Sequence, residues 1–323
     1  MSNPINELLK APIPKRLWHY TSIQAFHDIV KSKAMWATDL HFLNDREEFI
    51  HARALANEIV AATPELDANG FPNREFIQKA VTVAFDSGPL TRSQVFVASF
   101  TAAEDQLGQW RAYSHGSSGV SLAFDLKAFR PPEDIDTLVS FAPCVYDPSK
   151  KQELLMHALH HFTEEVSSYW ERTFRTACEL DPDKLTSIDK KQVVKEFLEA
   201  NPIKKAPFEE FKAAVTKTGV DCLRIAALLK NSSFEEENEW RLVLPTLLDR
   251  PSPMKNPPRF RVGKTTLIPY IAHPFAASAP LPIVDMILGP GSDENSVFAA
   301  QRFLKLEGLD LKPRISKVPY RAS

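Results

Sequence analysis

The uneven distribution of strand and helix patterns along this chain constrains its fold more than any other feature. Alternating or continuous apolar segments typical of strands occur before and after the stretch from Lys150 to Lys230, which itself shows only helical periodicity. A doubly wound parallel sheet requires strands and helices to alternate regularly. The sequence therefore predicts an α+β fold, a single domain over residues 1–323 with a helical insertion at about 150–230.

The expected strands lie on both sides of that insertion. They are Leu17–Tyr20, Ala34–Ala37, Gln94–Phe100, Gly119–Asp125, Phe141–Tyr146, Trp240–Leu244, Arg259–Val262, Thr266–Tyr270 and Ile283–Leu288. Capping-box spacings at Thr21 and Asp45 predict that a helix begins after each of them. A last helix is expected at Glu294–Leu306.

Composition excludes several classes of protein. The formal net charge of the 323 residues is -2, so no broad basic field favours nucleic acid or an anionic membrane. No apolar run reaches the roughly 18–20 residues that cross a bilayer, and the N-terminus has no apolar signal core. Three widely spaced cysteines argue against disulfides and zinc, and Gly-rich nucleotide motifs are absent. A cytoplasmic protein with no membrane partner is expected.

The first candidate site is His19-Tyr20-Thr21, at the end of an expected strand and directly before a helix. Free backbone N–H groups at a helix N-terminus favour anions and hydroxyls, His donates to a sugar hydroxyl, and Tyr offers a stacking face. A purely structural interpretation stays open, in which Thr21 caps the helix and Tyr20 belongs to the core.

Two further candidates flank this one. The turn at Asn44-Asp45 is interpreted either as a helix cap or as one wall of a pocket. Trp110 and Tyr113 are three residues apart and share a helical face, where they either stack on a flat ring or pack in the core.

The fourth candidate is an acidic segment ending in a strand. Alternation places Glu237, Glu239 and Arg241 on one face of that strand, each two residues apart. Neighbouring carboxylates beside an arginine raise one carboxyl pKa or orient a sugar hydroxyl. A solvated acidic face is the structural alternative, and paired carboxylates also suit a glycosidase or a nuclease.

A metal site is not expected. His157, His160 and His161 have helical spacing, but no carboxylate or cysteine accompanies them at a telling distance in the sequence.

Several of these motifs, in this order, resemble an uncharacterised bacterial family, domain of unknown function 2971. The resemblance covers roughly Leu17 to Leu306. It rests on Leu17–Ser22, Phe42–Asp45 with Glu48, Ser99–Thr101 through Trp110 and Tyr113 to Gly119–Phe124, Glu237 with Glu239–Arg241, and the Leu288-Gly289-Pro290 turn.

A weaker resemblance is to the ADP-ribosyltransferase superfamily, whose split α/β core binds NAD between two small sheets. That resemblance implies that His19 and Thr21 contact a ribose and that Glu239 is catalytic, with Glu237 as its paired glutamate. Tyr20, Phe42, Trp110 and Tyr113 compete for the aromatic that stacks on nicotinamide. Two features depart from the superfamily pattern. Paired glutamates usually accompany an arginine on the first strand, where this chain has His19, and the helical block lies outside the common core.

This second resemblance implies an NAD-dependent ADP-ribosyltransferase or an NAD glycohydrolase, with a toxin or an anti-phage effector as the expected biological role. NAD would be the substrate, and the macromolecular acceptor would be a protein or a nucleic acid. On this hypothesis Asn44, Asp45 and Arg241 help to form the NAD site, and no metal is needed. The alternative is a non-catalytic module that senses a nucleotide or binds a protein, with Glu239 serving only as a salt-bridge partner of Arg241.

Overall fold

The chain divides into two compact units. The computed structural model describes residues 3–43, 46–86, 93–113, 119–125, 139–183, 189–200, 217–247, 257–263, 265–275 and 281–319. The helical unit comprises Met1–Asn6, Glu47–Ser93 and Asp147–Leu229, and the sheet unit comprises Glu7–Arg46, Gln94–Tyr146 and Lys230–Ser323. Both units are assembled from separated stretches of sequence.

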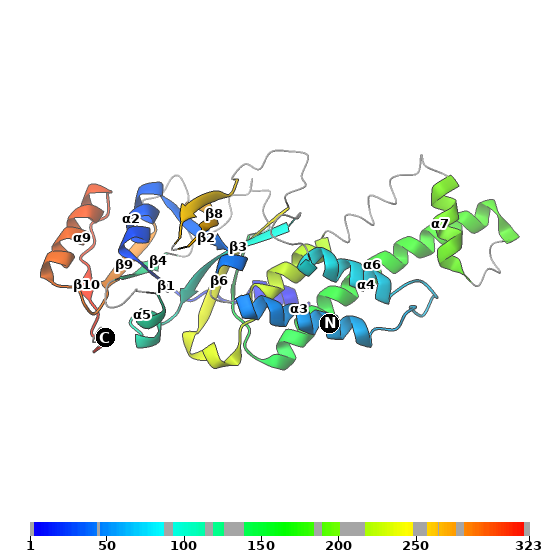
Figure 1. Ribbon diagram of the computed structural model, residues 1–323, viewed down its shortest axis with the longest axis horizontal. Coiled ribbons are helices and arrows are strands. Elements are labelled where there is room, and N and C mark those ends of the chain that lie inside the picture. Colours follow the sequence, from blue (N-terminus) through cyan, green and yellow to red (C-terminus); the bar gives the residue numbers. More distant parts are fainter. Residues whose placement is uncertain are drawn as a thin grey trace. The chain divides into compact units, whose positions relative to one another are not determined.

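The sheet unit contains one mixed β-sheet (Figure 1). Its strands are β1 (Leu17–Thr21), β2 (Ala34–Asp39), β3 (Ser93–Thr101), β4 (Val120–Phe124), β5 (Ser140–Pro143), β6 (Glu239–Leu247), β7 (Arg259–Val262), β8 (Leu267–Pro274), β9 (Ile283–Leu288) and β10 (Arg314–Ile315). They follow the order β10-β9-β4-β1-β3-β2-β8-β7, and β6 pairs with β3 and β5. The pair β9–β10 is parallel, whereas β1–β4, β4–β9 and β2–β8 are antiparallel. The predicted α+β class is confirmed, with a mixed sheet.

The sheet is weakly joined between β1 and β3. These two strands share the single register pair Trp18↔Thr101, whereas β1 pairs with β4 over all five of its residues. On its other side, β3 pairs with β2 through Thr38↔Val97 and Asp39↔Phe96. Because β1 and β3 separate after one pair, side chains from both strands face a space that no ladder fills.

Helix α2 (Ile23–Ser32) follows β1 and covers the core of the sheet unit. Its N-cap is Ser22, whose side chain accepts a hydrogen bond from the backbone N–H of Ala25. The expected cap at Thr21 is therefore wrong by one residue, because Thr21 is still the last residue of β1. Phe26 and Ile29 lie on one face of α2 and are buried in the main hydrophobic cluster.

Two other helices complete the sheet unit. They are α5 (Leu107–Tyr113) and α9 (Glu294–Leu306). Helix α9 has a full capping box between Asp293 and Ser296, and its bounds match the sequence prediction.

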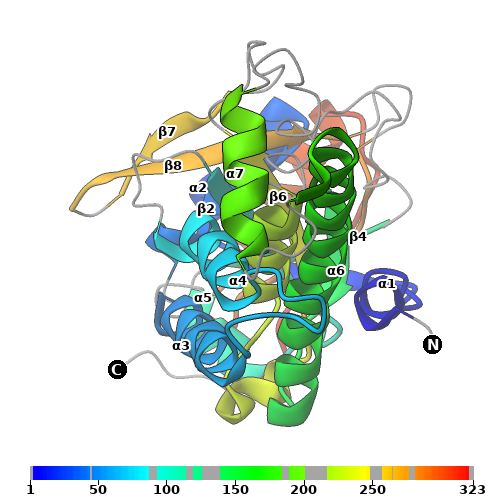
Figure 2. The same cartoon turned by 90° about the vertical axis from the view of Figure 1, so that its right-hand side faces the viewer.

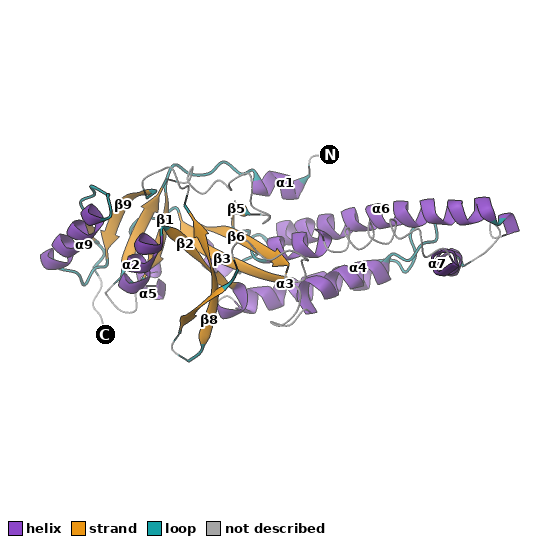
Figure 3. Cartoon of the chain, turned by 90° about the horizontal axis from the view of Figure 1, so that it is seen from above, coloured by secondary structure: helices purple, strands orange, loops and turns teal. Residues whose placement is uncertain are grey.

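The helical unit packs α3 (Arg46–Ala62), α4 (Arg74–Val81), α6 (Pro148–Leu180) and α7 (Lys190–Ala200) (Figure 2). Helix α6 contacts both α4 and α7. Residues 217–226 are also helical. The described part of the predicted helical segment at 150–230 is thus helical, and α3 and α4, from earlier in the chain, join it in the same unit (Figure 3). One short helix, α1 (Pro4–Leu9), crosses the boundary between the units.

Within the described residues, no helix combines the length and apolar character that crossing a membrane requires.

Candidate functional site

A cavity of about 170 Å³ lies in the sheet unit where β1 and β3 separate. Its walls come from β1, β2, β3, α2, α5, β7 and the segment that leads into β6. The predicted site residues that line it are His19, Tyr20, Thr21, Tyr113, Glu237 and Glu239. Residues from both ends of the sequence are therefore brought together at one place.

His19 is held in a fixed orientation by β3. Its Nδ1 lies 2.8 Å from the carbonyl oxygen of Ser99, and since a carbonyl only accepts, Nδ1 carries the proton. Burial lowers the pKa of this imidazole, the bond to Ser99 opposes that effect, and the positive charge of Arg261 lowers the pKa further. His19 is thus neutral near pH 7, and its Nε2 is an acceptor.

Tyr20 is fastened to the loop after β3. Its hydroxyl donates to the carbonyl of Ala103 at 3.2 Å and accepts from the backbone N–H of Gln106 at 3.0 Å. Burial raises the pKa of this hydroxyl to about 12. The ring meets Trp110 edge to face, with centroids 4.7 Å apart. Tyr20 is therefore a wall of the cavity with its hydroxyl already engaged.

Glu239 is a buried carboxylate held by two cations. Arg241 donates to it through Nε at 2.8 Å and through Nη2 at 3.2 Å, and Lys230 Nζ donates to Oε2. Burial raises the pKa of this carboxyl, but the two neighbouring cations outweigh burial and hold the pKa at about 2. Glu239 is ionised at every physiological pH, and these bonds leave one acceptor site on Oε1.

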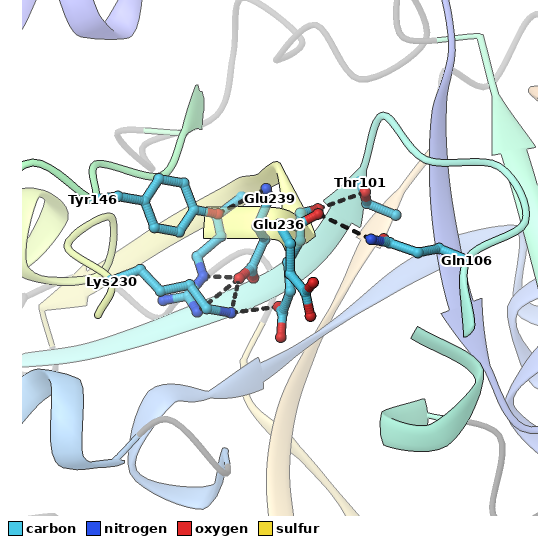
Figure 4. Close-up of polar contacts among 8 residues, drawn as sticks. Thr101, Gln106, Tyr146, Lys230, Glu236 and Glu239 are labelled. Atoms are coloured by element: carbon cyan, nitrogen blue, oxygen red, sulfur yellow. Dashed lines mark hydrogen bonds and ion pairs between the residues drawn. The ribbon is translucent and has the colours of Figure 1, made fainter. Parts of the chain in front are cut away.

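The backbone around Glu239 is fixed on both sides (Figure 4). Its N–H donates to the hydroxyl of Tyr146 at 2.9 Å. Thr101 Oγ1 donates to the carbonyl of Glu237 at 2.6 Å, and Gln106 Nε2 donates to that of Glu236 at 3.1 Å. The start of β6 is thereby tied to the end of β3, which sets where Glu239 sits in the cavity wall.

Glu237 does not lie on the strand, in contrast to the sequence prediction. It ends a 3₁₀ helix, η5 (Ser232–Glu237), and Asn238 then adopts a left-handed conformation with φ 43°. The two carboxylates nevertheless meet, because Lys230 Nζ bonds Glu237 Oε2 at 2.7 Å as well as Glu239. A lysine, rather than strand alternation, brings them together.

The remaining predicted site residues fall elsewhere. Trp110 is fully buried beside Tyr20, its Nε1 donates to Asp105 at 2.7 Å, and it does not line the cavity. Arg241 also lies behind the cavity wall, because its guanidinium is occupied with Glu239. Neither side chain lines the cavity, and their predicted contact with a ligand stays a prediction. Asn44 and Asp45 lie outside the described residues.

Sequence reasoning missed two cations that shape the site, Lys230 and Arg261. The sequence places Lys230 at the end of the helical block, and nothing in its local pattern signals that its side chain reaches Glu239. Arg261 lies on an expected strand with alternating charges, which is typical of an ordinary solvated edge strand. Only the tertiary structure places the Arg261 side chain in the cavity.

Among the described residues, no group of three or more His, Cys, Asp or Glu side chains has a metal-binding arrangement. The cysteines Cys144, Cys178 and Cys222 are all buried and reduced.

The comparison with known families gives one match. The family described as "Protein of unknown function (DUF2971)" matches residues 109–242, which include Tyr113, Glu237, Glu239 and Arg241. The predicted resemblance to this family is confirmed over those residues; His19 and Arg261 lie outside them. No curated protein and no solved structure matches the chain significantly.

Proposed function

We propose that this cavity binds NAD and that the protein is an NAD-dependent ADP-ribosyltransferase or an NAD glycohydrolase. The observation that carries the proposal is that His19 and Glu239 line one cavity at the division of a mixed sheet, although they are far apart in the sequence. A split sheet with a ligand at the division is what the resemblance to ADP-ribosyltransferases leads one to expect.

The chemistry follows from the two side chains. Cleavage of the bond between ribose and nicotinamide develops positive charge on the sugar. The Glu239 carboxylate, kept ionised by Arg241 and Lys230, would stabilise that charge and accept a ribose hydroxyl at its remaining Oε1 site. His19, neutral and fixed by Ser99, would accept a second ribose hydroxyl at Nε2. With its two ends held, the sugar would be positioned for cleavage.

The aromatic that stacks on nicotinamide would be Tyr113, since it lines the cavity while Trp110 does not. Tyr20 also lines the cavity, but its hydroxyl is bonded to the chain itself. The acceptor of ADP-ribose would be water, a protein or a nucleic acid.

The test is nicotinamide release from NAD by the purified protein. We expect Glu239→Gln to reduce release at least 100-fold, because the neutral amide provides no negative charge beside the ribose. Glu75→Gln is the matched control: Glu75, in the helical unit, also bonds two lysines, and this variant should keep the wild-type rate. Melting temperatures must show that Glu239→Gln is folded, and His19→Gln gives a second, independent loss of activity. Wild-type release in Glu239→Gln would remove the catalytic assignment.

One observation favours a second candidate, a module that binds a nucleotide without cleaving it. Lys230 and Arg241 both neutralise Glu239, so its field inside the cavity is weaker than that of a lone carboxylate. Calorimetric binding of NAD with no nicotinamide released would favour this module.

The role as a toxin or phage-defence effector is a separate proposal with its own test. Growth arrest on expression of the wild-type chain, relieved by Glu239→Gln, would support it.

A further inference from the structure

Strand β7 has the reverse of the usual pattern for a strand at the margin of a sheet. It pairs with β8 as an antiparallel hairpin (Figure 2). Its apolar residues Phe260 and Val262 are 64% and 88% exposed, whereas Arg261 between them is partly buried and lines the cavity. An amphipathic strand normally buries its apolar side and exposes its charges. In this hairpin the charged side chain of Arg261 points toward the cavity instead.

The guanidinium of Arg261 is incompletely satisfied in that position. Its Nη2 donates to Thr38 Oγ1 at 2.9 Å, while its Nε is buried and has no hydrogen-bond partner. No carboxylate of the described residues pairs with it, and burial lowers its pKa. A buried charge is stable only when it is paired or hydrogen-bonded, and the described residues provide no counter-charge for this arginine.

A protective role for the edge strand does not explain these contacts. Inward-pointing charges on edge strands do prevent sheets from pairing edge to edge. That role does not require the guanidinium to line a cavity, nor its Nε to be buried without a hydrogen-bond partner.

The surroundings favour an anion as the missing partner. Arg261 and His19 line the same cavity, and the positive charge of Arg261 adds to the effect of burial in lowering the pKa of the His19 imidazole. Both carboxylates that line the cavity, Glu237 and Glu239, are already bonded to Lys230. Among the described side chains lining the cavity, Arg261 is the one lysine or arginine, and no described carboxylate pairs with it.

We propose that Arg261 is the phosphate anchor of this cavity and that the ligand is a nucleoside diphosphate derivative bound through its pyrophosphate. The planar fork of arginine suits the bidentate geometry of phosphate oxygens, and Thr38 fixes the plane of that fork. The inference rests on the proposed function only in taking the same cavity as the ligand site. It adds a binding residue, outside the family match, that selects the ligand by charge.

The experiment measures binding by calorimetry, with ADP-ribose and adenosine as probes. We expect wild-type protein to bind ADP-ribose, and Arg261→Gln to weaken this binding by tenfold or more. Arg259→Gln is the matched control, because Arg259 is an exposed arginine on the same strand, and its affinity should stay within twofold of wild type. Adenosine, which has no phosphate, should bind wild type and Arg261→Gln equally weakly. Arg261→Lys retains the charge without the planar fork, so its affinity for ADP-ribose should lie between those of the wild type and Arg261→Gln.

The outcomes separate this inference from the proposed function. ADP-ribose binding that depends on Arg261, without any nicotinamide release from NAD, would support the anchor and remove the enzyme. Unchanged ADP-ribose affinity in folded Arg261→Gln would overturn the anchor, whatever the enzyme activity. Wild-type protein that binds ADP-ribose no better than adenosine would overturn it as well.

Discussion

Each of the two units contains a glutamate that bonds two cations, and burial separates the two arrangements. In the helical unit, Glu75 bonds Lys79 at 3.0 Å and also Lys191, and 42% of its side chain is exposed. In the sheet unit, Glu239 bonds Lys230 and Arg241, and its side chain is 2% exposed. The pKa of both carboxyls is lowered, for Glu75 chiefly by the bond from Lys191.

The ion pairs of a glutamate carboxylate therefore affect stability differently in the exposed and the buried arrangement. Water screens an exposed ion pair and solvates each partner when the pair separates, so such pairs add about 0–1 kcal/mol to stability. A buried carboxylate has no solvent to replace a lost partner. We therefore expect the charges around Glu239 to be coupled tightly and those around Glu75 loosely.

The largest expected effect comes from removing the lysine of the buried arrangement. Lys230→Met leaves Glu237 and Glu239 without their shared partner, and we expect a loss of about 3–5 kcal/mol in the free energy of unfolding. Lys191→Met in the helical unit should cost less than about 1 kcal/mol. Urea unfolding of both variants at pH 7 measures the difference. Equal losses would show that burial does not distinguish the two arrangements.

A second contrast involves histidines and pH. His273 in β8 is 3% exposed, its Nε2 has no hydrogen-bond partner, and burial lowers its pKa from 6.5 to about 4. Because the unfolded chain binds this proton below about pH 6.5 and the folded chain only below about pH 4, stability is complete above pH 6.5 and falls as the pH drops to 4. The loss is on the order of 3 kcal/mol.

The test compares urea unfolding between pH 7 and pH 4. His273→Leu should remove the part of this slope that comes from His273, while His19, whose pKa burial also lowers, keeps a slope of the same sign. His161→Gln should leave the slope unchanged, because His161 is half exposed in the helical unit. Glu239 does not affect the pH dependence of stability above about pH 4.5. Its lowered pKa makes stability fall only from about pH 4.5 toward pH 2. If the pH dependence of stability in His273→Leu equals that of the wild type, His273 does not contribute to it.

The smallest expected effect concerns the helical unit alone. Lys79 and Glu75 are four residues apart on α4, and a pair of this kind adds about 0.3–0.5 kcal/mol. Lys79→Met should cost that amount, and 1 M NaCl should remove most of the difference between variant and wild type. The coupling between Glu239 and Arg241, measured in a double-mutant cycle, should persist in the same salt. Salt sensitivity of both couplings would remove the distinction between the units.

Much of the sheet and part of the site follow from local patterns. Alternation and apolar runs predict the strands from β1 to β9, because successive side chains of a strand point to opposite faces and each segment shows this period of two. Local patterns single out His19 and Thr21 at the end of an apolar strand, Glu237 and Glu239 in the acidic segment, and Tyr113 on a short helix, and all five line the cavity. Their roles there stay predictions.

The sequence could not decide interactions that span long separations. The context of Trp110 fits either a stacking aromatic or a core residue, and the structure packs it against Tyr20 in the core. The short helix η5 breaks the strand alternation that was assigned to Glu237. No local pattern reports which distant residue will lie beside another.

The sequence by itself determined the elements, since hydrophobic periodicity and caps act within a few residues. Only the tertiary structure decided that β1 and β3 separate after one pair, that Lys230 joins Glu237 to Glu239, and that Arg261 and His19 line one cavity. These arrangements depend on the burial and pairing of charges across the sheet, and their energies exist only once the chain has folded and excluded water around them.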